Sequence, residues 1–360
     1  MLCRPAIRAL AILAALALPA AGAGADAAAS AGPAVIFKLG GQALGLTAGA
    51  YGIAVLEDAG GDCALVVIPA DGATPQTHLH GCVLPGADVA VAGSRTAWGG
   101  YQDVRCSETT AAVYSAEGRG GRLVQSIPGD CLGYGTSYRG LASDGSSLFY
   151  SLLVTAEPDG ATNCGEGGPC HWKLAGGRIM RLSPGGPVAD RRLPAAALIA
   201  ADAGRIALVE PAKSASSTGK TFDWPRAATN GKVEVRATAT GAVLSSFAPR
   251  GAVRAIALAG GKAVVLVATS GGPRFEWYDA STGARLGTAS APSGTAFRIS
   301  TDGNEVAFAA LDTVRVLDLG TGAQRVLART TGAPVGPSVT DGRVVWVENG
   351  KNPQVLAARV

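Results

Sequence analysis

The three histidines of this chain, His78, His80 and His171, offer limited chemistry. His78 and His80 lie two residues apart, so on a strand both imidazoles would point to the same side and could share a metal ion. No third ligand stands at a supporting spacing, which favours the alternative that both belong to the polar face of an edge strand. No G-x-S-x-G nucleophile element is present. We therefore predict no catalytic residue, no metal site and no cofactor.

Two polar segments, 157–176 and 211–231, concentrate large aromatic and charged side chains in a chain that is only 5% aromatic. We predict both as long loops. Exposed aromatic residues beside charges are typical anchors for protein partners or sugar rings. The alternative is that the tryptophans fold down and seal their own loops. With an extension of the same surface at 101–105, the candidate binding residues are Tyr101, Arg105, His171, Trp172, Lys173, Phe222, Asp223, Trp224 and Arg226.

Around these segments the sequence repeats a unit of four short strands. Glycine-bearing turns follow one another 39 to 59 residues apart between Gly49 and Gly342. Short apolar and β-branched runs separated by Gly, Asp and Asn are typical of antiparallel hairpins. Repeats of about 40 residues with four strands each are typical of propeller blades. Two clear copies predict strands over 254–259, 262–269, 274–280 and 284–289, and over 296–301, 305–311, 313–319 and 324–329.

We therefore predict an all-β fold, a seven-bladed β-propeller of four-stranded antiparallel blades. The last copy has only three strands, 336–340, 343–348 and 353–360, while a lone strand at 34–39 precedes the first copy. This N-terminal strand would complete the C-terminal blade, and the ring would have no open terminal edges. The alternative is a sandwich or an open repeat. The predicted propeller domain covers residues 34–360.

The first 25 residues have the pattern of a cleaved secretory signal peptide. Arg4 and Arg8 precede an apolar stretch at 9–18. Pro19 and the small residues 23–25 follow this stretch. The apolar run is shorter than the roughly 20 residues of a membrane-spanning helix. We expect a flexible mature N-terminus at 26–33, no transmembrane segment after cleavage, and a secreted or extracytoplasmic protein.

Six cysteines remain after the signal, and an even number in an exported protein favours three disulfides over a metal site. Sequence alone permits fifteen pairings of six cysteines. The blade model selects one, because two of its pairs centre on predicted hairpin turns and opposed strand residues have Cβ atoms about 4.5–5.5 Å apart. The predicted pairs are Cys63 with Cys82, Cys106 with Cys131, and Cys164 with Cys170.

The charge of the chain is low and evenly spread. The formal net charge is +4 and falls to +2 without Arg4 and Arg8, and there is no run of basic residues. A nucleic-acid-binding protein would show a basic stripe. We therefore expect no nucleic-acid partner, and we expect a monomer.

Several turns resemble a known repeat. The segment 300–308, Ser-Thr-Asp-Gly-Asn-Glu-Val-Ala-Phe, is similar to the S-x-D-G-x-x-[IV]-A-F motif of the WD40-like repeats in TolB-type secreted bacterial propellers. Looser copies stand at 142–150 and 339–346, and 278–283 and 317–322 resemble the hairpins of these propellers. The resemblance implies the blade fold and leaves the function open. The Gly-His and Trp-Asp dipeptides of eukaryotic WD40 repeats and the Asp box of sialidases are absent.

Loops between blades, and loops that join the second and third strands of a blade, emerge on one face of a propeller. We predict an exported, non-catalytic binding module that presents this face to a protein or cell-envelope glycan partner. The alternative is a lactonase- or lyase-like propeller enzyme with a metal- or anion-binding site at the central channel. The channel candidates are Arg139, Arg254 and Arg298. Arginine stays protonated and cannot readily act as a base, which favours the binding module.

Overall fold

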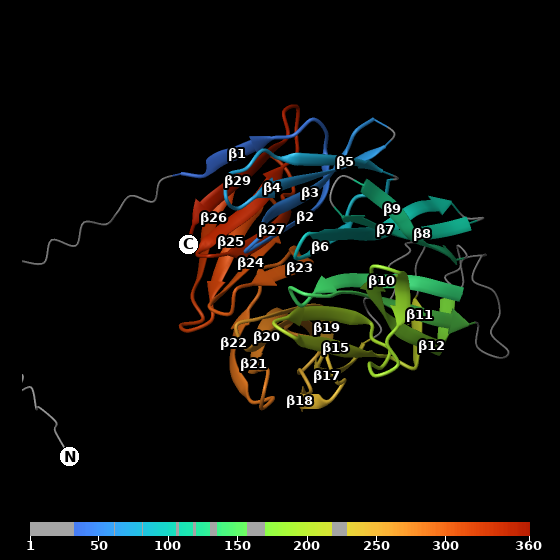
Figure 1. The fold of residues 1–360 in the computed structure, drawn as a ribbon. Coiled ribbons are helices and arrows are strands. Elements are labelled where there is room, and N and C mark those ends of the chain that lie inside the picture. Colours follow the sequence, from blue (N-terminus) through green and yellow to red (C-terminus); the bar gives the residue numbers. More distant parts are fainter. Residues whose placement is uncertain are drawn as a thin grey trace, which may run out of the picture. The chain divides into compact units, whose positions relative to one another are not determined.

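The computed structural model describes residues 32–60, 62–80, 82–105, 108–117, 120–129, 135–156, 170–217 and 229–360. These residues form a ring of seven four-stranded antiparallel blades (Figure 1). The predicted all-β, seven-bladed propeller is confirmed. Successive strands of a blade run from the innermost to the outermost position. The sheets of blades 2 and 3 are joined by the single pair Gly129 and Gly135.

The first four blades follow the chain in order. Blade 1 consists of β2 (Ala43–Gly49), β3 (Gly52–Asp58), β4 (Cys63–Pro69) and β5 (Gln76–His80). Blade 2 consists of β6 (Asp88–Ala92), β7 (Arg95–Arg105), β8 (Glu108–Glu117) and β9 (Gly120–Gly129). Blade 3 consists of β10 (Gly135–Ser143), β11 (Leu148–Ala156), β12 (Cys170–Ser183) and β13 (Gly186–Ala189). Blade 4 consists of β14 (Leu198–Asp202), β15 (Arg205–Pro211), β17 (Thr229–Ala237) and β18 (Val243–Phe247), with β16 (Ser214–Ser217) as an extra strand.

The last three blades complete the ring. Blade 5 consists of β19 (Ala252–Ala259), β20 (Lys262–Thr269), β21 (Gly272–Asp279) and β22 (Arg285–Ser290). Blade 6 consists of β23 (Thr295–Thr301), β24 (Glu305–Ala310), β25 (Thr313–Asp318) and β26 (Gln324–Arg329). Blade 7 consists of β27 (Val335–Thr340), β28 (Arg343–Glu348), β29 (Gln354–Arg359) and, at its outer edge, β1 (Ala34–Lys38). The strand β1 runs antiparallel to β29, with Ala34 opposite Ala357.

The hydrophobic core is divided among the seven junctions between neighbouring blades. Each of seven clusters of buried side chains draws its members from two adjacent blades. Between blades 5 and 6, for example, the ring centroids of Phe275 and Phe308 lie 4.8 Å apart, with the two rings tilted relative to each other. Such aromatic pairs add to the stabilisation that comes from area burial alone. Among the described residues the core is thus distributed between blades, and each blade depends on both neighbours.

The innermost strand of blade 1 approaches the neighbouring blade closely at a glycine. At Gly45, a Cβ atom would lie 2.4 Å from the carbonyl oxygen of Ala87 in the neighbouring blade. Heavy atoms do not approach that closely without displacement of the backbone. Glycine at this position therefore permits the close contact between blades 1 and 2.

A network of charges joins blades 3 and 4. The carboxylate of Asp190 accepts hydrogen bonds from Arg181 at 3.0 Å and from Arg192 at 2.7 Å, and its side chain is only 3% exposed. Arg181 also donates to the carbonyl oxygen of Thr238 in blade 4 and stacks over the ring of Phe149. Hydrogen bonds from Arg192 and Arg181 lower the pKa of Asp190 to about 2 from its usual 3.8.

A disulfide links Cys63 and Cys82 in blade 1. The predicted partners are therefore correct, but the predicted register is not. In the ladder Cys63 lies opposite His80, and Cys82 follows the end of β5. The ladder is offset by two residues from the predicted alignment, because its pairs centre between Asp71 and Gly72 and not between Gly72 and Ala73. The predicted pairs Cys106 with Cys131 and Cys164 with Cys170 lie outside the residues whose side chains the structure describes.

Removal of the Cys63–Cys82 disulfide should destabilise the protein. In the Cys63→Ala/Cys82→Ala double variant we expect the free energy of unfolding to fall by about 3 kcal/mol, because the bridge restricts the unfolded chain across a separation of 19 residues. Urea unfolding under non-reducing conditions measures the difference. Peptide mapping of the unmodified protein provides the control and also tests the two other predicted pairs. A double variant as stable as the unmodified protein would contradict this expectation.

The Asp190 network should make stability depend on pH in the acid range. Because the folded pKa of Asp190 is below its unfolded value, its contribution of about 2 kcal/mol is present above about pH 4 and is lost as the pH falls towards 2. Urea unfolding of Asp190→Asn should therefore show a deficit that is largest near pH 7 and shrinks below pH 4. Asp62→Asn, at an exposed carboxylate, is the control and should show no such deficit. An equal deficit for Asp190→Asn at all pH values would oppose this interpretation.

Candidate functional site at the channel and the loop face

We call the end of the ring at which the innermost strands begin the loop face. In blade 3 this end is marked by the ladder, which places Gly135 opposite Thr155 and Thr155 opposite Leu174. The second strand of a blade therefore turns into the third at the same end. Blades 2 and 3 extend further than the others, since β7 has 11 residues and β12 has 14. Strands of blade 5, by comparison, have 6 to 8 residues.

The extension of β12 pairs with β16, which the chain reaches only after β15 of blade 4. The ladder runs from Cys170 opposite Ser217 to Lys173 opposite Ser214. It continues with a hydrogen bond of 2.8 Å from the Leu174 amide to the Lys213 carbonyl oxygen. The predicted loops 157–176 and 211–231 are thus partly wrong, because their ends form strands. This pairing joins two insertions far apart in sequence, so neither segment reveals it alone.

The candidate residues His171, Trp172 and Lys173 lie in this ladder, in β12. Successive side chains of a strand point to opposite faces of the sheet. His171 and Lys173 are exposed, whereas Trp172 is buried, with 9% of its surface exposed. The burial of Trp172 fits the alternative in which this tryptophan packs against its own segment.

The remaining candidates at the loop face are less fully described. Tyr101 in β7 is half-buried, and its hydroxyl donates a hydrogen bond of 3.2 Å to the carbonyl oxygen of Tyr138. Arg105 ends β7, but its side chain is outside the described part. The candidates Phe222, Asp223, Trp224 and Arg226 lie outside the described residues.

The two histidines considered as a metal pair lie in β5, the outermost strand of blade 1. His78 is buried and is placed opposite Leu65 in the ladder. The side chain of His80 is outside the described part. Across the residues that the structure describes, no group of three or more His, Cys, Asp or Glu side chains could hold a metal ion. Within the same ranges, no helix has the length and apolarity needed to cross a membrane.

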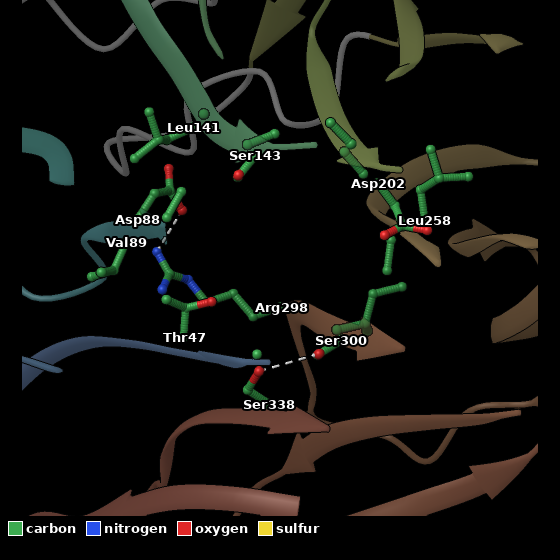
Figure 2. A pocket seen from close by; sticks show the side chains of 18 of the residues that line it. Thr47, Asp88, Val89, Leu141, Ser143, Asp202, Leu258, Arg298, Ser300 and Ser338 are labelled. Atoms are coloured by element: carbon green, nitrogen blue, oxygen red, sulfur yellow. Dashed lines mark hydrogen bonds and ion pairs between the residues drawn. The ribbon is translucent and has the colours of Figure 1, made fainter. Parts of the chain in front are cut away.

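A cavity of about 490 Å³ lies along the axis of the ring and is lined by the innermost strands of all seven blades (Figure 2). Apolar residues that line it include Val89, Leu141 and Leu258. Charged residues lie towards the two ends. Asp88 begins β6 and therefore lies at the loop face, whereas Asp202 ends β14 and lies at the opposite end. Burial raises the pKa of the Asp202 carboxyl group.

An ion pair crosses the loop-face mouth of this cavity. The guanidinium of Arg298 in blade 6 contacts the carboxylate of Asp88 in blade 2 at 2.7 Å, and each side chain is 26% exposed. Arg298 also donates a hydrogen bond to the carbonyl oxygen of Gly86. Figure 2 shows Arg298 extending from its strand towards Asp88. The pair therefore joins blades that are not neighbours in the ring.

The buried Tyr138 fixes the other side of Asp88. Its hydroxyl donates a hydrogen bond of 2.9 Å to the Asp88 carboxylate. Burial, together with the negative charge of Asp88, raises the pKa of Tyr138 well above its usual value. The phenol therefore remains protonated and continues to act as a donor at neutral pH.

The other two channel arginines lie near the same mouth. Arg139 lines the cavity, and the Arg254 guanidinium lies 5.8 Å from the ring centroid of Phe297, which also lines the cavity and is 46% exposed. The register of the β10 ladder shifts between Tyr138 and Gly140, at Arg139. The register of the β19 ladder shifts between Val253 and Ala255, at Arg254. Such bulges redirect a side chain.

Two serines in the wall of the cavity connect three blades. The hydroxyl groups of Ser300 and Ser338 lie 3.4 Å apart (Figure 2). Ser338 accepts a hydrogen bond from the Ala48 amide at 3.1 Å, and Ser300 accepts one from the Val339 amide at 3.1 Å. These hydroxyls thus hold blades 6, 7 and 1 together.

The structure therefore brings the three predicted channel arginines to one mouth. Sequence analysis did not identify Tyr138 or Phe297 as part of this site. Both are aromatic residues within strands, Tyr138 in β10 and Phe297 in β23, and nothing in their local sequence distinguishes them from core residues. Only the arrangement of seven blades around the axis brings them to the mouth.

No protein-family model matches the chain, and a search of curated proteins found no match. Solved structures of similar fold include a chain from the mitotic checkpoint complex, with a TM-score of 0.52 and 13% identity over 98% of this chain and 99% of that chain. Another is the β-propeller domain of Cps50 (Swd1) from Myceliophteria thermophila, with a TM-score of 0.53 and 9% identity over 91% of this chain and 100% of that domain. These likenesses show the fold alone, which is a β-propeller.

Substitution of the buried Trp172 should affect stability. We expect Trp172→Ala to lower the free energy of unfolding by about 3 kcal/mol, because truncation of a buried tryptophan leaves a cavity. Thermal and urea unfolding measure this loss. His171→Ala, at the exposed neighbouring position, should leave stability nearly unchanged. A Trp172→Ala variant with unchanged stability would instead indicate that the indole is available as a binding anchor.

Proposed function

We propose that this chain is an exported, non-catalytic binding module that presents its loop face to a protein or cell-envelope glycan partner. The observation that carries the proposal is the β12–β16 ladder. It holds part of blades 3 and 4 in a hydrogen-bonded sheet beyond the regular blade, on one side of the ring. A preformed surface binds with less loss of conformational entropy than a mobile one.

Exposed side chains on this ladder could supply the polar contacts. His171 and Lys173 are exposed on the same face of β12. We propose that they act together with Tyr101 and with the sequence candidates Arg105, Phe222, Asp223, Trp224 and Arg226. The similar chain in the mitotic checkpoint complex belongs to a protein assembly by its description, which supports a use of this fold in binding.

The Cys63–Cys82 disulfide supports export, because disulfides persist in oxidising compartments. It agrees with the expected signal peptide at residues 1–25. We therefore propose that the protein is secreted. The resemblance of segment 300–308 to the TolB-type repeat supports membership of that bacterial group, and we further propose that the protein acts as a monomer. Its partner would be met outside the cytoplasm.

The proposal is tested by binding of the mature chain, residues 26–360, to purified cell-wall glycan and to envelope proteins of its source organism. We expect the double variant His171→Glu/Lys173→Glu to bind at least about tenfold more weakly, because both exposed side chains of the ladder are replaced by negatively charged carboxylates. Surface plasmon resonance with each immobilised fraction measures the affinity.

The matched control is Arg325→Glu, a charge reversal at an exposed residue of the outermost strand β26 in blade 6. It should retain the affinity of the unmodified chain. Equal loss in both variants would show that binding depends on overall charge. Full binding by the His171→Glu/Lys173→Glu variant would place the site elsewhere and reject the ladder as the binding surface.

A further inference from the structure

We propose that the loop-face mouth of the channel is a second binding site, which takes a small organic carboxylate in place of Asp88 on Arg298. The site is separate from the β12–β16 ladder and does not depend on the function proposed for that ladder. Its ligand would have one charged group and an apolar body.

Charge favours an anion at this mouth. Among the described residues that line the cavity, the acidic side chains are Asp88 and Asp202, and Asp202 lies at the opposite end. Among the described residues at the loop-face mouth, Arg298 contacts the carboxylate of Asp88, and the guanidinium of Arg254 lies beside this pair on the ring of Phe297. Guanidinium groups bind carboxylates through paired, charge-assisted hydrogen bonds.

Size and shape favour a small organic molecule. The cavity volume of about 490 Å³ lies within the range of about 300–1,000 Å³ that is typical of small-ligand sites. Phe297 at the mouth is 46% exposed and supplies an apolar surface next to the positive charges. An apolar or aromatic body could pack on this ring while its carboxylate contacts Arg298.

Replacement of the Asp88 carboxylate by a ligand carboxylate on Arg298 should require little free energy, because the ion pair already exists. Arg298 already holds a carboxylate in the required position at 2.7 Å, so a ligand would occupy a prepared contact. When displaced, Asp88 would keep its hydrogen bond from Tyr138 and would remain in contact with water, since its side chain is 26% exposed. No charge would therefore be left buried without a partner, which is the usual penalty for breaking such a pair.

The test uses the mature chain and three probes, benzoate, the isosteric uncharged benzamide, and inorganic phosphate. Isothermal titration calorimetry at low ionic strength measures binding of each. We expect benzoate to bind, benzamide to bind at least about tenfold more weakly, and phosphate to compete poorly because it lacks the apolar body. Equal binding of phosphate and benzoate would indicate an adventitious ion only and would overturn the proposal.

Two substitutions at the ion pair should change benzoate affinity in opposite directions. Arg298→Gln removes the cation and should weaken binding at least about tenfold. Asp88→Asn removes the competing carboxylate but still accepts a hydrogen bond from Tyr138, so it should strengthen binding several-fold. Arg325→Gln is the charge-matched control in the same blade and should bind as the unmodified chain does.

The opposite changes in benzoate affinity distinguish a binding site from an ion pair with a purely structural role. If Asp88→Asn weakens benzoate binding as Arg298→Gln does, the pair only maintains the fold and the proposal fails. If Arg298→Gln does not fold, Asp88→Asn and Phe297→Ala decide, with a gain and a loss of affinity respectively. Absence of benzoate binding to the unmodified chain, or unchanged affinity in Asp88→Asn, would also overturn the proposal.

Discussion

Apolar packing between neighbouring blades is the constraint on which the other features of this molecule depend. Each sheet is buried against a sheet on either side, and the buried side chains fall into seven clusters that each belong to two blades. Such packing is satisfied throughout only if the last sheet meets the first. The pairing of β1 with β29, and the contacts of Ser338 with Ala48, lie where these two ends of the ring come together.

The channel is a consequence of the same packing. Seven innermost strands surround the axis but cannot all touch one another, so a cavity remains between them. Side chains at its mouth therefore meet across the ring, without regard to their distance in sequence. Asp88 and Arg298 are separated by 210 residues and still form an ion pair. Because Tyr138 orients Asp88 from the side, the mouth has a defined arrangement of charge in the folded protein.

Strand length can vary at the loop face, because the hydrophobic clusters between blades do not depend on residues beyond the regular blade. Strands β7 and β12 can extend beyond the blade without altering the clusters between blades. In blades 3 and 4 the extensions pair with each other, which satisfies backbone groups that would otherwise require water. In this small ladder the side chain of Trp172 is buried, whereas the side chains of His171 and Lys173 on the opposite face are exposed to solvent.

The sequence by itself determined the blade unit, because turn residues and alternating apolar side chains act over a few positions. Strands β20, β26 and β28 have the predicted bounds, and Cys63 does bond to Cys82. Tertiary structure decided the two-residue shift in that hairpin, the β12–β16 ladder and the ion pair across the mouth. These depend on how sheets are placed around a ring. Local patterns contain no information on that placement, since it arises from packing between residues far apart in the chain.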